Sequence, residues 1–160
     1  MVSPLLSPDR CGGSNLFTMP DKKIKIRKSQ DVVKILKQTW RLLSQIWIFD
    51  RKLVCIPASE IESIVKAVWQ KMKNAGEKLD CDDQALFLHA AVKKYWAANF
   101  KGDQPLAFGE AAGTMFKGWP GVHNQNIAIS ESGKILMIEP QTKEIWGAHK
   151  TDDQPFWLRF

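Results

Sequence analysis

Apolar residues recur at helical spacing in the first part of the chain, where we expect three helices. The first carries an apolar stripe and is capped by Ser29 or Asp31. The second opens at Ser59 and Glu62, which have the spacing of a capping box. The third is rich in Ala and Leu and runs from Cys81 to about Asn99. The stripe of the first helix consists of Val32, Ile35, Leu36, Trp40, Leu43 and Trp47.

Strand-like runs flank the first helix and dominate the chain after residue 102. Alternating charged and apolar residues from Lys22 to Lys28 predict an edge strand, and Lys52 to Ile56 predicts a second short strand. Three further strands are expected later, with a hairpin turn at Glu131 to Gly133. They cover Pro105 to Phe116, Asn124 to Ser130 and Lys134 to Glu139. Helices followed by an antiparallel sheet indicate the α+β class.

A chain of 160 residues with 44% hydrophobic content is long enough for one compact domain. Residues 1–20, rich in Pro and Gly, predict an irregular N-terminal arm, and residues 21–160 a single domain. No run approaches the roughly 20 apolar residues of a membrane span, and the start lacks the pattern of a secretory signal. The three cysteines show no CxxC spacing. We therefore expect a reduced, cytoplasmic protein with no membrane partner, disulfide or zinc site.

Cys81, His123 and Glu139 carry the candidate chemistry. Cys81 is expected in the first turn of a helix, with Asp80 as its cap, where the helix dipole favours a thiolate. His123 enters a strand and Glu139 ends the next, and the hairpin between them places the two residues near each other. A carboxylate across the ladder can orient an imidazole, as in the catalytic triad of a cysteine hydrolase. The competing interpretations are a buried structural cysteine and a surface His–Glu hydrogen bond.

The remaining histidines and cysteines are poorer candidates. His89 lies on the helix of Cys81 but faces another direction, and His149 falls in a polar segment. Cys55 lies among apolar residues and is expected in the core, whereas Cys11 falls in the arm.

Three motifs carry a resemblance to a known family. With Cys81-Asp82-Asp83 opening a helix, His123-Asn124-Gln125-Asn126 opening a strand and Ile138-Glu139-Pro140-Gln141-Thr142 closing the next, the chain resembles the papain-like cysteine proteases. It is similar to the C-terminal domain of the fairy-ring mushroom agglutinin and to bacterial and phage transglutaminase-like cysteine proteinases. The resemblance implies a papain-like fold, with N-terminal helices packed on a C-terminal antiparallel sheet and the cysteine at a helix N-terminus.

The same resemblance implies roles for individual residues. Cys81 would be the nucleophile, His123 the general acid and base, and Glu139 the residue that orients the imidazole. Asn74 or Gln70 would supply the amide that holds the oxyanion, and Gln141 is a secondary site residue.

The resemblance also bears on a metal. The agglutinin domain depends on calcium, for which Asp82 or Asp83 could be ligands. No EF-hand-like loop is present, so we expect no metal site and no cofactor.

Two functions follow as hypotheses. The leading one is a cysteine hydrolase, a peptidase or amidase that acts on a peptide or protein through a thioester acyl-enzyme. A transglutaminase or deamidase would use the same residues, and a phage accessory protein would fit the small size.

The alternative is a catalytically silent scaffold that binds nucleic acid or a protein partner through its basic N-terminal third, in line with the net charge of +6. Trp40 and Trp47 could then stack on bases, although core tryptophans behind a solvated face are the simpler interpretation. The basic residues are Lys22 to Lys28, Lys34, Lys37, Arg41 and Arg51.

Overall fold

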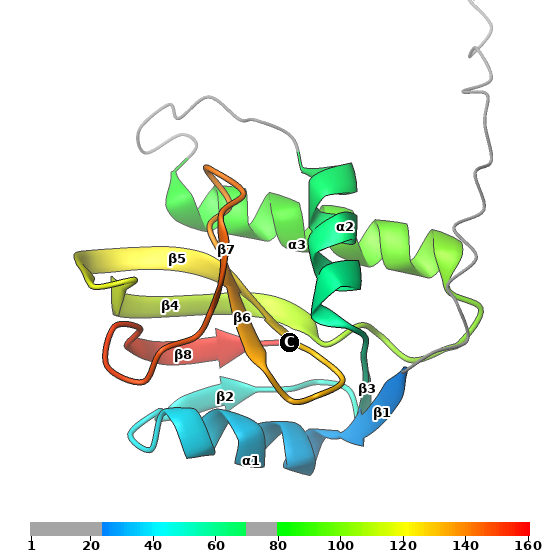
Figure 1. Cartoon of the computed structure of the whole chain (residues 1–160), viewed down its shortest axis with the longest axis horizontal. Coiled ribbons are helices and arrows are strands. Elements are labelled where there is room, and N and C mark those ends of the chain that lie inside the picture. Colours follow the sequence, from blue (N-terminus) through cyan, green and yellow to red (C-terminus); the bar gives the residue numbers. More distant parts are fainter. Residues whose placement is uncertain (1–23, 70–79) are drawn as a thin grey trace, which may run out of the picture.

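In the computed structural model, residues 24–69 and 80–160 are described (Figure 1). The predicted arm at residues 1–20 lies outside the described residues, and so do Gln70 and Asn74. The helices are α1 (Ser29–Thr39), α2 (Ala58–Val68) and α3 (Cys81–Asn99). The strands are β1 (Lys25–Lys28), β2 (Gln45–Trp47), β3 (Lys52–Cys55), β4 (Phe108–Phe116), β5 (Trp119–Ile129), β6 (Ile135–Ile138), β7 (Ile145–Gly147) and β8 (Pro155–Arg159).

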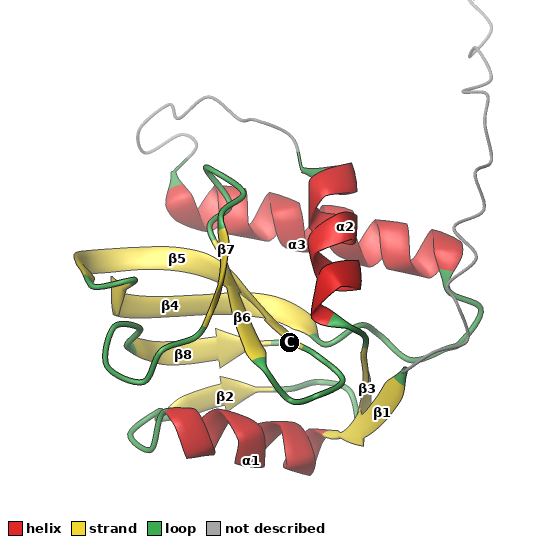
Figure 2. Cartoon of the chain, viewed as in Figure 1, coloured by secondary structure: helices red, strands yellow, loops and turns green. Residues whose placement is uncertain are grey.

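Six of these strands form one mixed sheet in the order β2-β8-β4-β5-β6-β7 (Figure 2). Its neighbouring strands are antiparallel except for β2 and β8, which run parallel. Strands β1 and β3 pair separately as a small antiparallel sheet. Figure 1 shows α1 on one side of the large sheet and α2 and α3 on the other. The described part of the chain is therefore a sheet covered by helices on both faces.

The buried residues of the central strands explain these layers. All four residues of β6 are buried, and successive side chains of a strand point to opposite faces. Ile135 and Met137 pack in the core beneath α1, whereas Leu136 and Ile138 pack in the core beneath α2 and α3. A strand that is covered on both faces reads as a continuous apolar run, and the sequence of β6 has that form.

The predicted papain-like plan, with N-terminal helices packed on a C-terminal antiparallel sheet, is wrong. Strand β2 comes from the N-terminal part of the chain, yet it joins the large sheet parallel to the C-terminal β8. Gln45 pairs there with Trp157. In addition, α1 lies on the opposite face from α2 and α3. The first helix is also shorter than expected, because the chain leaves it after Thr39 and buries Leu43 from a turn.

The helix starts are partly as predicted. Helix α3 begins at Cys81 with Asp80 in the cap position, although Asp80 makes no side-chain cap hydrogen bond. Helices α1 and α2 have no side-chain cap either, so the predicted caps at Ser29 or Asp31 and at Ser59 are wrong. Ser59 instead lies within the first turn of α2, where its carbonyl accepts a hydrogen bond from the Ser63 hydroxyl.

Two hairpins close the two opposite ends of β5. The predicted β5–β6 hairpin is confirmed: Asn126 pairs with Ile138, and Gly133 in its turn has a φ of 89°. Strands β4 and β5 are joined by Lys117 and Gly118, with φ of 52° and 76°, the combination of a type I′ turn. This tight turn starts β5 at Trp119, earlier than the predicted Asn124.

No helix among the described residues is long and apolar enough to cross a membrane.

Candidate functional site

A pocket of about 460 Å³ lies where the β4–β5 hairpin meets the chain around the turn between β6 and β7. This volume is typical of sites for small ligands. Its lining combines two tryptophans with several polar side chains. The lining includes Lys117, Trp119, His123, Gln125, Glu139 and Trp146.

Glu139 is the centre of the polar side of this pocket. Its Oε2 lies 3.0 Å from Nε2 of His123 and accepts a hydrogen bond of 2.8 Å from the Gln125 amide. Its Oε1 accepts the backbone N–H of Gln141 at 2.9 Å. The cross-strand contact predicted between His123 and Glu139 is therefore confirmed. The Glu139 side chain is 15% exposed and that of His123 is 30% exposed, so the imidazole is the more accessible partner.

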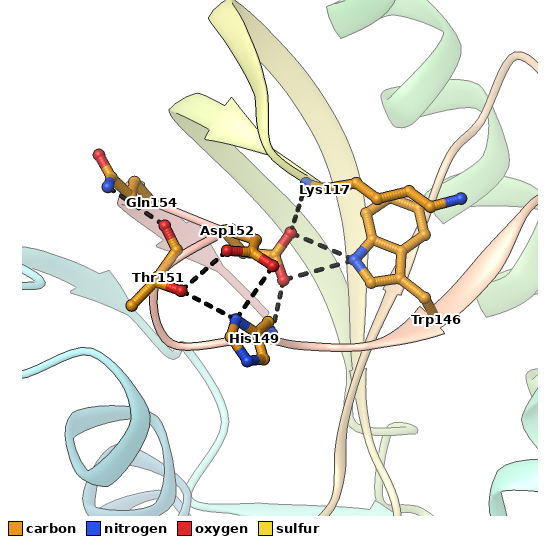
Figure 3. A network of polar contacts seen from close by, with 7 residues as sticks. Lys117, Trp146, His149, Thr151, Asp152 and Gln154 are labelled. Carbon is orange, nitrogen blue, oxygen red and sulfur yellow. Dashed lines mark hydrogen bonds and ion pairs between the residues drawn. The ribbon is translucent and has the colours of Figure 1, made fainter.

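Asp153 fixes the aromatic side of the pocket from behind. It is fully buried, and its carboxylate accepts hydrogen bonds from the indole of Trp146 at 3.2 and 3.4 Å. The same carboxylate accepts the backbone N–H of Lys117 at 2.9 Å and that of His149 at 2.6 Å. Figure 3 shows Lys117, Trp146 and His149 converging on this network. A buried carboxylate with four donor contacts thus ties the hairpin tip to the Trp146 ring.

Lys117 and Trp119 complete the pocket from the β4–β5 hairpin. The Lys117 ammonium forms an ion pair with Glu144 and lies 5.8 Å from the centre of the Trp146 ring, a cation–π distance. Trp119 is 77% exposed. An exposed tryptophan at the edge of a pocket leaves a large apolar surface for a ligand to cover.

The turn that follows Glu139 is held by Trp69. Its indole donates a hydrogen bond of 2.8 Å to the carbonyl of Pro140, and Lys143 lies 4.9 Å from the centre of its ring. Gln141, which lines the pocket as well, is next to this anchored residue.

Cys81 does not line this pocket. It is a partly exposed thiol in the first turn of α3. Within residues 24–69 and 80–160, no hydrogen bond joins its sulfur to His123, so the predicted contact between these two groups stays a prediction. Helix α3 is anchored to the sheet by Asn126, whose amide donates to the carbonyls of Ala85 and Gly109.

The other predicted site residues fall in different places. Asn74 and Gln70 lie outside the described residues. Cys55 is buried in the core as expected, and burial raises the pKa of its thiol to about 11. In the described part of the chain no group of three or more His, Cys, Asp or Glu side chains could hold a metal ion. The expected absence of a metal site and of a cofactor stays a prediction, and the calcium ligands that the resemblance suggested, Asp82 and Asp83, stay untested.

A second His–Glu pair is buried between α3 and the sheet. Nδ1 of His89 lies 2.6 Å from Oε1 of Glu110, and Nη2 of Arg159 donates to both Glu110 oxygens at 2.8 Å. Burial alone raises the pKa of Glu110, but the hydrogen bonds and positive charges of His89 and Arg159 outweigh it and hold that pKa below its ordinary value. Glu110 is therefore an ionised, compensated group inside the fold.

Several residues of the pocket were not predicted from the sequence. Lys117 and Gly118 form a dipeptide of the type that can close a two-residue hairpin, and this signal would have placed Trp119 on the same strand as His123. Trp146 and Asp153 had no comparable signal, because their hydrogen bond spans an irregular loop and the contact of Asp153 with Lys117 joins segments 36 residues apart.

Comparisons with known proteins support the fold. No family model and no curated protein matches the chain. The solved structures that are similar to it include two with a TM-score of 0.66 over 84% of this chain. One is the PSL1a–E64 complex, 23% identical and covered over 51% of its length. The other is Polyporus squamosus lectin bound to the human-type influenza-binding epitope Neu5Acα2-6Galβ1-4GlcNAc, 22% identical and covered over 49%. The chain spans about half the length of these structures.

These comparisons correct the family and function predicted above. The fold found is that of a lectin structure, and no papain-like or transglutaminase-like family model matches. The predictions of a cysteine hydrolase, a thiol protease, a phage accessory protein and a peptide or protein substrate are therefore wrong. The assignment of Cys81, His123, Glu139, Asn74 and Gln141 as site residues stays a prediction.

The alternative of a silent scaffold that binds nucleic acid or a protein partner is wrong as well. Trp40, one of the two tryptophans expected to stack on bases, is buried in the core at 6% exposure. The groove on α1 that carries Lys34, Lys37 and Arg41 has no aromatic side chain in its lining. One of the two predicted stacking tryptophans is therefore covered by the core, and the groove beside these basic residues offers no aromatic ring to a base.

Proposed function

We propose that the pocket between the β4–β5 hairpin and the β6–β7 turn binds a glycan. The observation that carries this proposal is the meeting of Trp119 and Trp146 with the hydrogen-bonded cluster of His123, Gln125 and Glu139 in one pocket. A sugar ring has apolar C–H faces and a rim of hydroxyl groups. It is therefore recognised by flat aromatic surface combined with fixed donors and acceptors.

The aromatic side supplies the apolar contact. Trp119 is largely exposed, so a sugar that packs on its ring removes apolar surface from water. Trp146 is fixed by the buried carboxylate of Asp153, so little side-chain freedom is lost when a ligand arrives. In this role Asp153 is a positioning residue.

The polar side supplies the hydrogen bonds. Glu139 is held by His123, Gln125 and the Gln141 backbone, which keeps the cluster in one arrangement before binding. Hydroxyl groups both donate and accept, so they match an imidazole, an amide and a carboxylate placed together. Hydrogen bonds to the charged Glu139 would be the strongest of the set.

The first ligand to test is Neu5Acα2-6Galβ1-4GlcNAc, because this glycan is bound in one of the solved structures with this fold. The support for this choice is the shared fold, together with the cationic Lys117 at the pocket and the net charge of +6, which suit a sugar carboxylate. Lys117 already pairs with Glu144, so the ligand carboxylate would have to share its ammonium.

Calorimetric titration of this trisaccharide tests the proposal. Trp119→Ala is expected to weaken binding about tenfold, since a buried aromatic anchor contributes more than 1 kcal/mol. Trp47→Ala is the matched control, because Trp47 is also exposed, at 53%, and does not line the pocket. Equal effects of the two substitutions would contradict the proposal, and so would a protein that binds E64 but no glycan.

We also propose that the protein works in the cytoplasm. Both cysteines in the described part of the chain, Cys55 and Cys81, are free thiols, as expected in a reducing compartment. Mass spectrometry of the untreated protein would show three free thiols, and an oxidised pair would count against this location.

A further inference from the structure

A second pocket, of about 310 Å³, lies between α3 and the end of β8. Leu86, His89, Ala90 and Lys93 follow the i, i+3, i+4, i+7 spacing and therefore share one face of α3. Arg159, Phe160 and Phe49 face them from the neighbouring chain segments. None of these residues lines the glycan pocket.

One part of this second pocket is apolar and exposed. Phe49 is 71% exposed and Leu86 is 47% exposed. The Phe49 ring lies 6.3 Å from that of Trp47, so two aromatic rings adjoin each other beside the pocket. A ligand with a hydrocarbon or aromatic portion would remove this surface from water.

The other part carries excess positive charge. The carboxylate of Glu110 is compensated by Arg159, which uses only its Nη2 for the two hydrogen bonds. Lys93 has no ion-pair partner among the residues that the structure describes. The balance of Glu110, Arg159 and Lys93 is therefore positive even with His89 neutral, which suits an anion.

His89 provides an independent sign of a ligand position. The residue is 6% exposed and lines the pocket, and its Nδ1 is taken by Glu110. Its other ring nitrogen, Nε2, is buried and has no hydrogen-bond partner in the described part of the chain. Buried polar atoms are nearly always hydrogen-bonded, so an orphaned nitrogen in a pocket wall marks a place for a polar ligand atom.

We propose that this second pocket binds a small organic anion, a carboxylate that carries an aromatic or aliphatic group. The carboxylate lies against Lys93 and the free edge of the Arg159 guanidinium, and it accepts a hydrogen bond from Nε2 of His89 in the imidazolium form, because Nδ1 of the same ring donates to the ionised Glu110. The apolar group packs on Phe49 and Leu86. This arrangement satisfies the orphaned nitrogen, neutralises the excess charge and covers the exposed apolar surface with one molecule.

Benzoate followed by NMR tests this proposal, with neutral benzamide as the isosteric control. Benzoate is expected to shift the His89 ring and Leu86 methyl signals in a saturable way, and benzamide is expected to bind at least several-fold more weakly. Lys93→Gln should weaken benzoate binding about threefold, the size of a partly exposed ion pair. Lys94→Gln removes the same charge from the adjacent exposed position of α3 and should leave binding unchanged.

Three results would overturn the proposal. They are equal binding of benzoate and benzamide, equal effects of the two lysine variants, and shifts confined to residues outside this pocket. Phe49→Ala removes the apolar contact without touching the buried His89–Glu110 pair, and unchanged benzoate affinity in that variant would also count against it. Trp119→Ala should leave benzoate binding intact, which separates this site from the glycan pocket.

Discussion

The protein contains two histidine–glutamate pairs in contrasting surroundings. His123 and Glu139 lie 3.0 Å apart in the wall of a pocket, with side chains 30% and 15% exposed. His89 and Glu110 lie 2.6 Å apart between α3 and the sheet, with side chains 7% and 4% exposed. The buried carboxylate has an arginine as a further partner, whereas the pocket carboxylate is held by neutral amides.

This difference separates two uses of the same residue types. A buried carboxylate loses its hydration, so it needs full compensation and contributes mainly to holding the fold together. A carboxylate in a pocket wall that is 15% exposed keeps access to solvent, so it can exchange water for the hydroxyl groups of a ligand. We therefore expect changes at Glu110 to act on stability and changes at Glu139 to act on binding.

The largest expected effect is on stability at the buried pair. Glu110→Gln removes the buried carboxylate that accepts hydrogen bonds from Arg159, whose side chain is 37% exposed, and should lower the free energy of unfolding by about 2 kcal/mol. Glu139→Gln keeps an oxygen acceptor in a partly solvated place and should cost about 1 kcal/mol or less. Urea unfolding of both variants measures the difference, and equal losses would remove the distinction between the two pairs.

The buried pair should also leave a signature in the pH dependence of stability. Because the pKa of Glu110 is lowered on folding, its contribution is fully present above the unfolded pKa of about 4.3 and is lost as the pH falls through the lower folded value. The stability gap between the wild type and Glu110→Gln should therefore be constant near pH 6 and shrink below about pH 4. A gap that grows on acidification would show that the assigned sign is wrong.

At the pocket the expected effect is on affinity. Glu139→Gln and His123→Gln should each weaken trisaccharide binding about fivefold, the loss of roughly 1 kcal/mol of hydrogen bonding. His149→Gln is the matched control, since His149 is an exposed histidine that does not line the pocket. If His149→Gln weakens binding as much as His123→Gln, the polar cluster does not contact the ligand.

The smallest effect concerns the two described thiols. Cys55 is buried and its pKa is raised to about 11, so at neutral pH it is almost entirely the unreactive thiol. Cys81 is partly exposed at the start of α3 and should be alkylated first by limiting iodoacetamide. Peptide mapping reads the order of labelling, and earlier labelling of Cys55 would mean that its core segment opens readily.

Sequence patterns predicted the local features and missed the distant contacts. The start of α3 at Cys81 and the contact between His123 and Glu139 could be predicted, because helix spacing and hairpin register are set by neighbours in the chain. The pairing of β2 with β8 could not, since it joins opposite ends of the chain.

Trp47 shows why the first helix was predicted too long. It continued the helical spacing of apolar residues but lies in strand β2, where pairing with Arg159 decides its conformation. The tryptophans of the pocket were missed for a related reason. Trp119 depends on the tight turn at Lys117 and Gly118, and Trp146 depends on Asp153, whose burial no local pattern reveals.

The most direct test of the glycan proposal is an NMR titration of the tryptophan indole N–H signals with Neu5Acα2-6Galβ1-4GlcNAc. The chain has seven tryptophans, and single Trp→Phe variants assign their signals. We predict saturable shifts at Trp119 and Trp146, which line the pocket, and none at the buried Trp40 or at the exposed Trp47. Unchanged signals at Trp119 and Trp146 under saturating trisaccharide, or shifts centred on Trp47, would contradict the proposal.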